Sequence, residues 1–118
     1  MLTLDKIYHA AYVLKEVARK TDLIYAENLS KNGQVYLKTE NLQVTGSFKL
    51  RGAYYKISQL SEEQKKAGII ACSAGNHAQG VALAATKMGA KSVICMPDGA
   101  PISKVEATKG FGAQVTLV

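Results

Sequence analysis

The feature that most constrains the fold is an alternation of short apolar runs with helix-like segments downstream of Gly68. Three β-rich apolar runs, at 69–74, 92–96 and 114–118, predict strands. Two segments of helical pattern, at 81–89 and 102–110, separate them, and each ends in glycine. Strands that are apolar throughout and joined by helices are typical of a parallel sheet covered on both faces. The expected fold class is therefore α/β, with a parallel sheet flanked by helices in the order β-α-β-α-β.

Upstream of this unit the sequence predicts three helices and one strand. An apolar stripe at helical spacing predicts a helix over 3–20 that begins at Thr3. Asn32-Gly33 marks a turn before an alternating strand. The remaining elements are that strand at 34–40, a helix from Ser47 to about Leu60, and a short helix from Ser61 that Gly68 ends.

The charge pattern argues against a polyanionic partner. The 118 residues carry 15 basic and 9 acidic side chains, a net charge of +6. A basic chain can bind nucleic acid or an anionic surface, but here the lysines are scattered and no aromatic residues alternate with a basic run. We therefore expect the charged side chains to lie on a solvated surface, with no nucleic-acid and no membrane partner. The length of the chain is that of a single domain.

Cys72 and Cys95 each lie inside an apolar run, which predicts two buried free thiols. Their number and spacing match neither a disulfide framework nor a zinc site, so no metal is expected. The first residues lack the basic start and long apolar stretch of a secretory signal, and no segment has the length and hydropathy of a membrane span. These features favour the reducing cytoplasm.

Residues 73–80, of sequence SAGNHAQG, form a loop that links the first apolar run to the following helix. In an open parallel sheet, ligands bind beyond the carboxyl ends of the strands, and free N–H groups at a helix N-terminus bind anions. Gly75 allows close backbone approach, and Ser73, Asn76 and His77 add polar side chains, so the loop suits a carboxylate or phosphate. The alternative is a plain turn in which Ser73 or Asn76 caps the helix, and on spacing the two interpretations are even.

Lys49 is placed between Phe48 and Leu50 in a mostly apolar run at 46–53. Partial desolvation in the first turn of a helix would favour the neutral amine, the form that makes a Schiff base with a carbonyl. The simpler interpretation is a lysine whose stem packs on the surface while its amine stays in water. On these residues alone the simpler interpretation is preferred.

Two segments change that preference by resemblance. KTENLQVTGSFKLRGA at 38–53 and CSAGNHAQGVALAA at 72–85 resemble the threonine dehydratase family, and the likeness continues through MPDGAPISKVEATKGFGAQVTLV to the last residue. These are two-domain pyridoxal-phosphate lyases of fold type II, the fold shared with the tryptophan synthase β subunit. The resemblance implies pyridoxal 5'-phosphate as cofactor and L-threonine, with L-serine as a second amino-acid substrate, giving 2-oxobutanoate and ammonia from threonine. It also implies a role in amino-acid metabolism, isoleucine biosynthesis included.

The resemblance assigns roles to individual residues. It implies that Lys49 binds the cofactor as a Schiff base and, once displaced by the substrate's amine, removes the α-proton. Phe48 would pack beside the cofactor, and Asn76 would hydrogen-bond its 3'-oxygen. The substrate's carboxylate would bind along the loop, at Ser73, Ala74, Gly75, Asn76 and His77.

The family's enzymes have a second half, which supplies the loop that grips the cofactor's phosphate and the group that faces the pyridine nitrogen. The chain stops at Val118, on the last apolar residue of a strand, which predicts an N-terminal portion without that half. By resemblance, residues 1–44 belong to the larger domain and residues 45–118 form most of the smaller α/β domain. Residues 1–44 would then expose apolar faces, in line with a homo-oligomer, and the portion alone is expected to be inactive.

Two other functions stay open. A serine racemase has similar motifs and adds an acid or base on the cofactor's opposite face, for which Ser73 is the candidate. A non-catalytic α/β module that binds an anion would form no Schiff base and would be indifferent to replacement of Lys49. A Rossmann dinucleotide site is disfavoured, because residues 73–80 lack the G-x-G-x-x-G pattern and no acidic residue ends the run at 92–96.

Overall fold

A three-stranded parallel sheet organises the C-terminal part of the chain. The computed structural model describes residues 1–118 and pairs the strands in the order β3-β4-β5, with bounds Ile69–Cys72, Ser92–Met96 and Gln114–Leu117. Helix α4 (Asn76–Lys87) connects β3 to β4, and α5 (Ile102–Gly110) connects β4 to β5. The predicted parallel β-α-β-α-β order is therefore confirmed.

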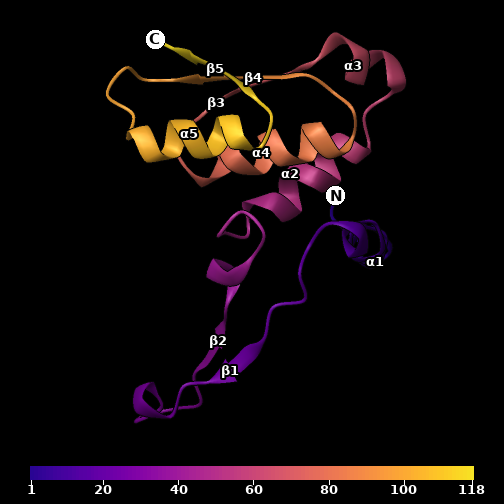
Figure 1. Cartoon of the computed structure of the whole chain (residues 1–118). Coiled ribbons are helices and arrows are strands. Elements are labelled where there is room, and N and C mark those ends of the chain that lie inside the picture. The colour runs from indigo at the N-terminus through magenta and orange to yellow at the C-terminus, as the bar shows by residue number, and fades with distance from the viewer.

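The two connecting helices lie on one face of this sheet (Figure 1). Ile94 and Met96 of β4 point to that face and are fully buried, while Ile70 of β3 points to the other and is 78% exposed. The expectation of a sheet covered on both faces is therefore wrong for this chain. The expectation of two buried thiols fails for the same reason, because Cys72 is exposed and Cys95 half-buried on the open face.

Helix α2 (Lys49–Ser58) packs against α4 and buries Leu50, Ala53, Tyr54 and Ile57 along its apolar stripe. The short helix α3 (Glu62–Ala67) follows and is fixed at its start by a capping box. In that box the Ser61 hydroxyl accepts from the Gln64 N–H, and the Gln64 side chain accepts from the Ser61 N–H. Gly68 ends α3 at a φ of 93°, which glycine adopts without strain.

The N-terminal segment is thinner and more exposed. Helix α1 (Leu4–Val13) continues as a 3-10 turn, η1 (Leu14–Glu16), so it is shorter than the predicted 3–20, and Thr3 precedes it without a side-chain capping bond. An antiparallel hairpin of β1 (Leu23–Tyr25) and β2 (Tyr36–Lys38) projects away from the sheet (Figure 1). Strand β1 was not predicted from the sequence, and β2 is shorter than the predicted strand at 34–40. Two further 3-10 turns are η2 (Glu27–Leu29) and η3 (Glu40–Leu42), and no helix has the length and hydropathy needed to cross a bilayer.

Candidate functional site

The loop after β3 is shorter than its sequence suggested. Helix α4 begins at Asn76, so only residues 73–75 are irregular, and GNHAQG forms the helix's cap and first turns rather than a loop. The Ser73 hydroxyl accepts from the Gly75 N–H at 3.2 Å, while the N–H groups of Ala74 and His77 donate to no protein acceptor. The loop therefore presents free backbone donors at the positive end of a helix, an arrangement that binds anions.

Lys49 is the first residue of α2, and its side chain is exposed rather than partly desolvated. Its amine lies 4.5 Å from the centroid of the Phe48 ring and forms no hydrogen bond or ion pair. Phe48 is itself 57% exposed. The structure thus holds an aromatic face and an unpaired amine side by side on an open surface.

Gly80 brings this lysine to the start of α4. A Cβ built on Gly80 would lie 3.0 Å from the carbonyl carbon of Lys49 and 3.1 Å from the backbone nitrogen of Leu50, closer than nine in ten Cβ contacts in proteins. Gly80 is four residues after Asn76, so the two share one face of α4 about one turn apart. The start of α2 therefore packs against α4 about one turn after Asn76, at a glycine for which the sequence pattern had indicated a loop.

Asn76 has a partner that the sequence did not reveal. The Lys104 ammonium, on α5, donates to the Asn76 side-chain oxygen at 3.3 Å. An ammonium has no acceptor, so the amide oxygen must face Lys104 and the amide NH₂ is left to donate elsewhere. Because 28 residues separate the two positions, no local spacing could have identified this pair.

A part-buried network ties the N-terminal segment to α2. Arg51 binds Glu40 through two nitrogens, at 2.8 and 2.9 Å, and Thr21 donates to the same carboxylate at 2.6 Å. The Arg51 hydrogen bond is the main reason that the pKa of Glu40 falls from 4.5 to about 2, against the opposing effect of burial. The network fixes the helix on which Lys49 sits, and it too joins residues distant in sequence.

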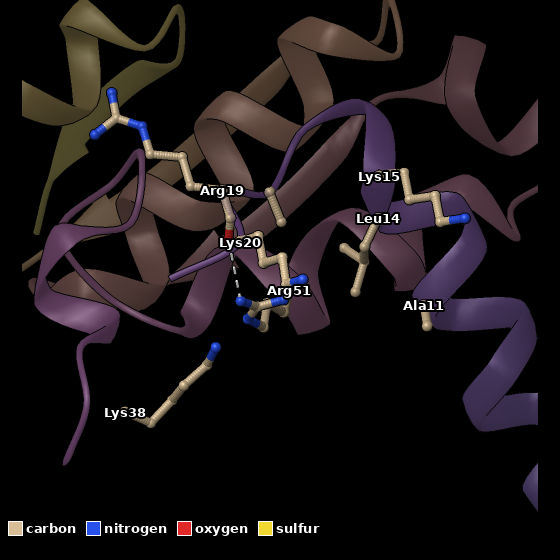
Figure 2. Close-up of a pocket in the computed structure, with 8 residues that line it drawn as sticks. Ala11, Leu14, Lys15, Arg19, Lys20, Lys38 and Arg51 are labelled. Atoms are coloured by element: carbon tan, nitrogen blue, oxygen red, sulfur yellow. Dashed lines mark hydrogen bonds between the residues drawn. The ribbon is translucent and has the colours of Figure 1, made fainter. Parts of the chain in front are cut away.

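A basic cavity of about 250 Å³ lies beside this network, between η1 and α2. Figure 2 shows Arg51 reaching across it to the Arg19 carbonyl oxygen, a 3.3 Å hydrogen bond. Lys49 does not line this cavity or either of the other two main ones. Of the expected site residues only His77 lines one of the three, a mostly apolar cavity of about 280 Å³ between α2, β3 and α4.

These residues fit the part of pyridoxal phosphate that the resemblance assigns to them. The unpaired Lys49 amine suits the cofactor's aldehyde, and the neighbouring Phe48 ring suits the cofactor's ring. The Asn76 amide NH₂, which the bond from Lys104 leaves free to donate, suits the oxygen on that ring. The free N–H groups beyond β3 suit a carboxylate. At Gly80 the first turns of the two helices are in close contact, so at this point the group would lie over the helix ends rather than between the helices.

Comparison with known proteins identifies the family to which the chain is similar. Residues 14–118 match the family model described as pyridoxal-phosphate dependent enzyme. An L-threonine ammonia-lyase of Thermotoga maritima is 56% identical over 119 residues, which cover 99% of this chain and 30% of that protein. A protein of Staphylococcus aureus strain N315 named L-threonine dehydratase catabolic TdcB is 54% identical, over 99% of this chain and 35% of its own length. The chain thus spans about a third of the length of these curated relatives.

Solved structures agree with the sequence comparison. Maize serine racemase superposes with a TM-score of 0.91 at 34% identity, covering 97% of this chain and 35% of the racemase. The processed form of threonine deaminase isoform 2 from Solanum lycopersicum gives 0.84 at 38% identity, covering 99% of this chain and 36% of the deaminase. The threonine dehydratase resemblance and the fold class are confirmed by these matches. Because the family model covers most of its length, the chain belongs to the family of pyridoxal-phosphate-dependent enzymes.

Proposed function

We propose that this chain is the N-terminal portion of a pyridoxal-phosphate-dependent L-threonine dehydratase, which converts L-threonine to 2-oxobutanoate and ammonia. The observation that carries the proposal is the close contact of α2 and α4 at Gly80, which joins the start of the helix that carries Lys49 to the first turns of the helix that begins at Asn76. The 56% identity to a protein named L-threonine ammonia-lyase supports threonine as the substrate.

In the proposed site, the chain's own residues divide into those that hold the cofactor and those that hold the substrate. Lys49 would bind pyridoxal phosphate through its amine, Phe48 would pack beside the ring, and the Asn76 amide would donate to the 3'-oxygen. When bound, the cofactor supplies a conjugated ring that draws electrons from the substrate's α-carbon. The substrate carboxylate would accept hydrogen bonds from the strand-to-helix segment, formed by Ser73, Ala74, Gly75, Asn76 and His77.

Lys49 has a second task in this proposal, as the base that takes the α-proton. A general base must come within hydrogen-bond reach of the proton that it removes and must have a free electron pair. No carboxylate pairs with the Lys49 amine, so no ion pair would have to break before the amine acts. Its exposure in this chain means that water competes for the amine, so exclusion of water would have to come from outside residues 1–118.

The proposed division of the chain follows its exposed surface. Residues 1–44 would be part of the larger domain and residues 45–118 most of the smaller one. Exposed apolar side chains on α1 and the hairpin support this division, among them Ile7, Tyr8, Tyr12, Leu23 and Tyr36. The same surface supports a homo-oligomer and an isolated portion that is inactive. The proposed setting is the cytoplasm.

The word catabolic in the name of the Staphylococcus relative supports a degradative role. The isoleucine-biosynthetic role implied by the resemblance is therefore not the one proposed. Serine racemase is the second candidate function, because the maize enzyme has the TM-score of 0.91. The lower identity of that match, 34% against 56%, favours the dehydratase.

Product analysis of the intact protein tests the proposal. We expect 2-oxobutanoate from L-threonine, complete loss of product in Lys49→Ala, and normal product in Lys56→Ala, an exposed lysine of the same helix. D-serine from L-serine without 2-oxobutanoate would identify the racemase instead. Full activity of Lys49→Ala would reject the assigned role, and no product from either amino acid would support a non-catalytic module.

A further inference from the structure

The open face of the sheet carries two thiols in direct register. Cys72, the last residue of β3, is the register partner of Cys95 in β4. Register partners in a parallel sheet project to the same face, and both thiols are free, with Cys72 exposed and Cys95 half-buried. Neither belongs to the proposed catalytic site, although Cys72 directly precedes Ser73.

The spacing of the strands suits a bond between these thiols. Neighbouring strands lie about 4.8 Å apart, and disulfides join residues whose Cα atoms are about 4.4–6.8 Å apart. The Ser73 N–H also donates to the Cys95 carbonyl at 3.0 Å, so the pairing continues past the thiols and fixes their register. The folded backbone therefore holds the two Cα atoms within the range that a disulfide spans.

We propose that Cys72 and Cys95 form a dithiol that closes to an intramolecular disulfide by exchange with a small-molecule disulfide such as oxidised glutathione. The Cys72 thiolate attacks one sulfur of the small disulfide, whose S–S bond breaks to release one small thiolate. The Cys95 thiolate then attacks the Cys72 sulfur and releases the second. The two cysteines lose two electrons and two protons, and the small disulfide becomes two thiols.

The order of the two steps follows from exposure. Thiol–disulfide exchange requires access, so the exposed Cys72 takes the first adduct and the half-buried Cys95 resolves it. The resulting disulfide would join the last residue of β3, Cys72, to β4. Cys72 directly precedes Ser73, where the strand-to-helix segment begins. A reductant reverses the closure, because the bond lies on an exposed face.

Mass spectrometry of the whole chain under non-reducing conditions tests the proposal. After incubation with oxidised glutathione, we expect a monomer lighter by two hydrogen atoms, with peptide mapping that joins Cys72 to Cys95 and full reversal by dithiothreitol. Cys95→Ser should stop at one glutathione adduct on Cys72. Two stable adducts on the unmodified chain, or a disulfide-linked dimer as the main product, would overturn the proposal.

Two controls show whether the folded register is responsible. Moving the second thiol two residues along the same face, by Cys95→Ser with Val93→Cys, separates the Cα atoms beyond the disulfide range, and closure should be lost. Closure of the unmodified chain should also be at least about tenfold faster when folded than in urea, because the sheet raises the effective concentration of one thiol at the other. Equal closure in the displaced variant, or faster closure in urea, would show that the unfolded chain forms the bond.

Discussion

Replacing Gly80 by alanine tests whether close packing of α4 on α2 builds the site. The added Cβ would lie 3.0 Å from the Lys49 carbonyl carbon and 3.1 Å from its oxygen. Both atoms belong to the backbone, and the next residue, Leu50, is fully buried in the core. The strain can therefore be relieved only by moving one helix away from the other.

The sign of the effect follows from two opposing terms. Alanine is favoured over glycine inside a helix by about 1 kcal/mol. Overpacking of a close contact costs about 1–3 kcal/mol, and a backbone that cannot yield puts this site in the upper part of that range. We expect Gly80→Ala to lower the free energy of unfolding by about 1–2 kcal/mol.

Gly52 provides a matched control, since it lies in α2 and a Cβ there would meet nothing within 4 Å. Gly52→Ala should raise the free energy of unfolding by up to about 1 kcal/mol. Urea denaturation of both variants, followed by circular dichroism, measures the difference. If Gly80→Ala is as stable as Gly52→Ala, the contact does not hold Lys49 in place and the reasoning is refuted.

Three further predictions concern groups around the site. Folding lowers the pKa of Glu40 from 4.5 to about 2, so the ionised carboxylate stabilises the folded chain. This contribution to the free energy of unfolding is complete above pH 4.5 and is lost as the pH falls towards 2. The pKa change limits the contribution of Glu40 to the free energy of unfolding to about 3 kcal/mol. Because the partner Arg51 side chain is 34% exposed, we expect a smaller contribution of about 1–2 kcal/mol. Denaturation measured over a pH series should show this contribution in the unmodified chain and not in Glu40→Gln. Ser61→Ala should cost about 1 kcal/mol in urea denaturation by removing the capping box, and an unchanged midpoint would contradict the cap. Lys104→Met should weaken pyridoxal phosphate binding by about 2- to 10-fold, because the Asn76 amide would lose the hydrogen bond that orients it. Lys109→Met, on the same helix, should leave binding unchanged. Equal effects of the two substitutions would contradict the role of Lys104 in orienting Asn76.

Much of the fold could be predicted because its signals are local. The apolar runs at 69–72 and 92–96, the glycines that end helices, and the Ser61 cap each act within a few residues. The start of α4 could not be predicted in this way. Glycine usually weakens a helix, so Gly80 suggested a loop, whereas its use here is to admit the backbone of Lys49.

Long-range pairing explains the other differences. Nothing near Glu40 in the sequence indicates that Arg51 and Thr21 will surround it, and nothing near Asn76 indicates Lys104. The cysteines were placed in apolar runs, but burial of a strand depends on what covers each face, and the connecting helices cover only one. The site residues themselves were identified by resemblance to a family, and their roles remain predictions.

The most direct test of the account is to locate pyridoxal phosphate on this chain after reduction with borohydride. The chain carries many exposed lysines, so the position of the label, and not its presence, is informative. Peptide mapping should find the label concentrated at Lys49 and absent from that peptide in Lys49→Ala, with Lys56→Ala unchanged. Labelling spread evenly over surface lysines would contradict the claim that residues 1–118 build the lysine's part of the site.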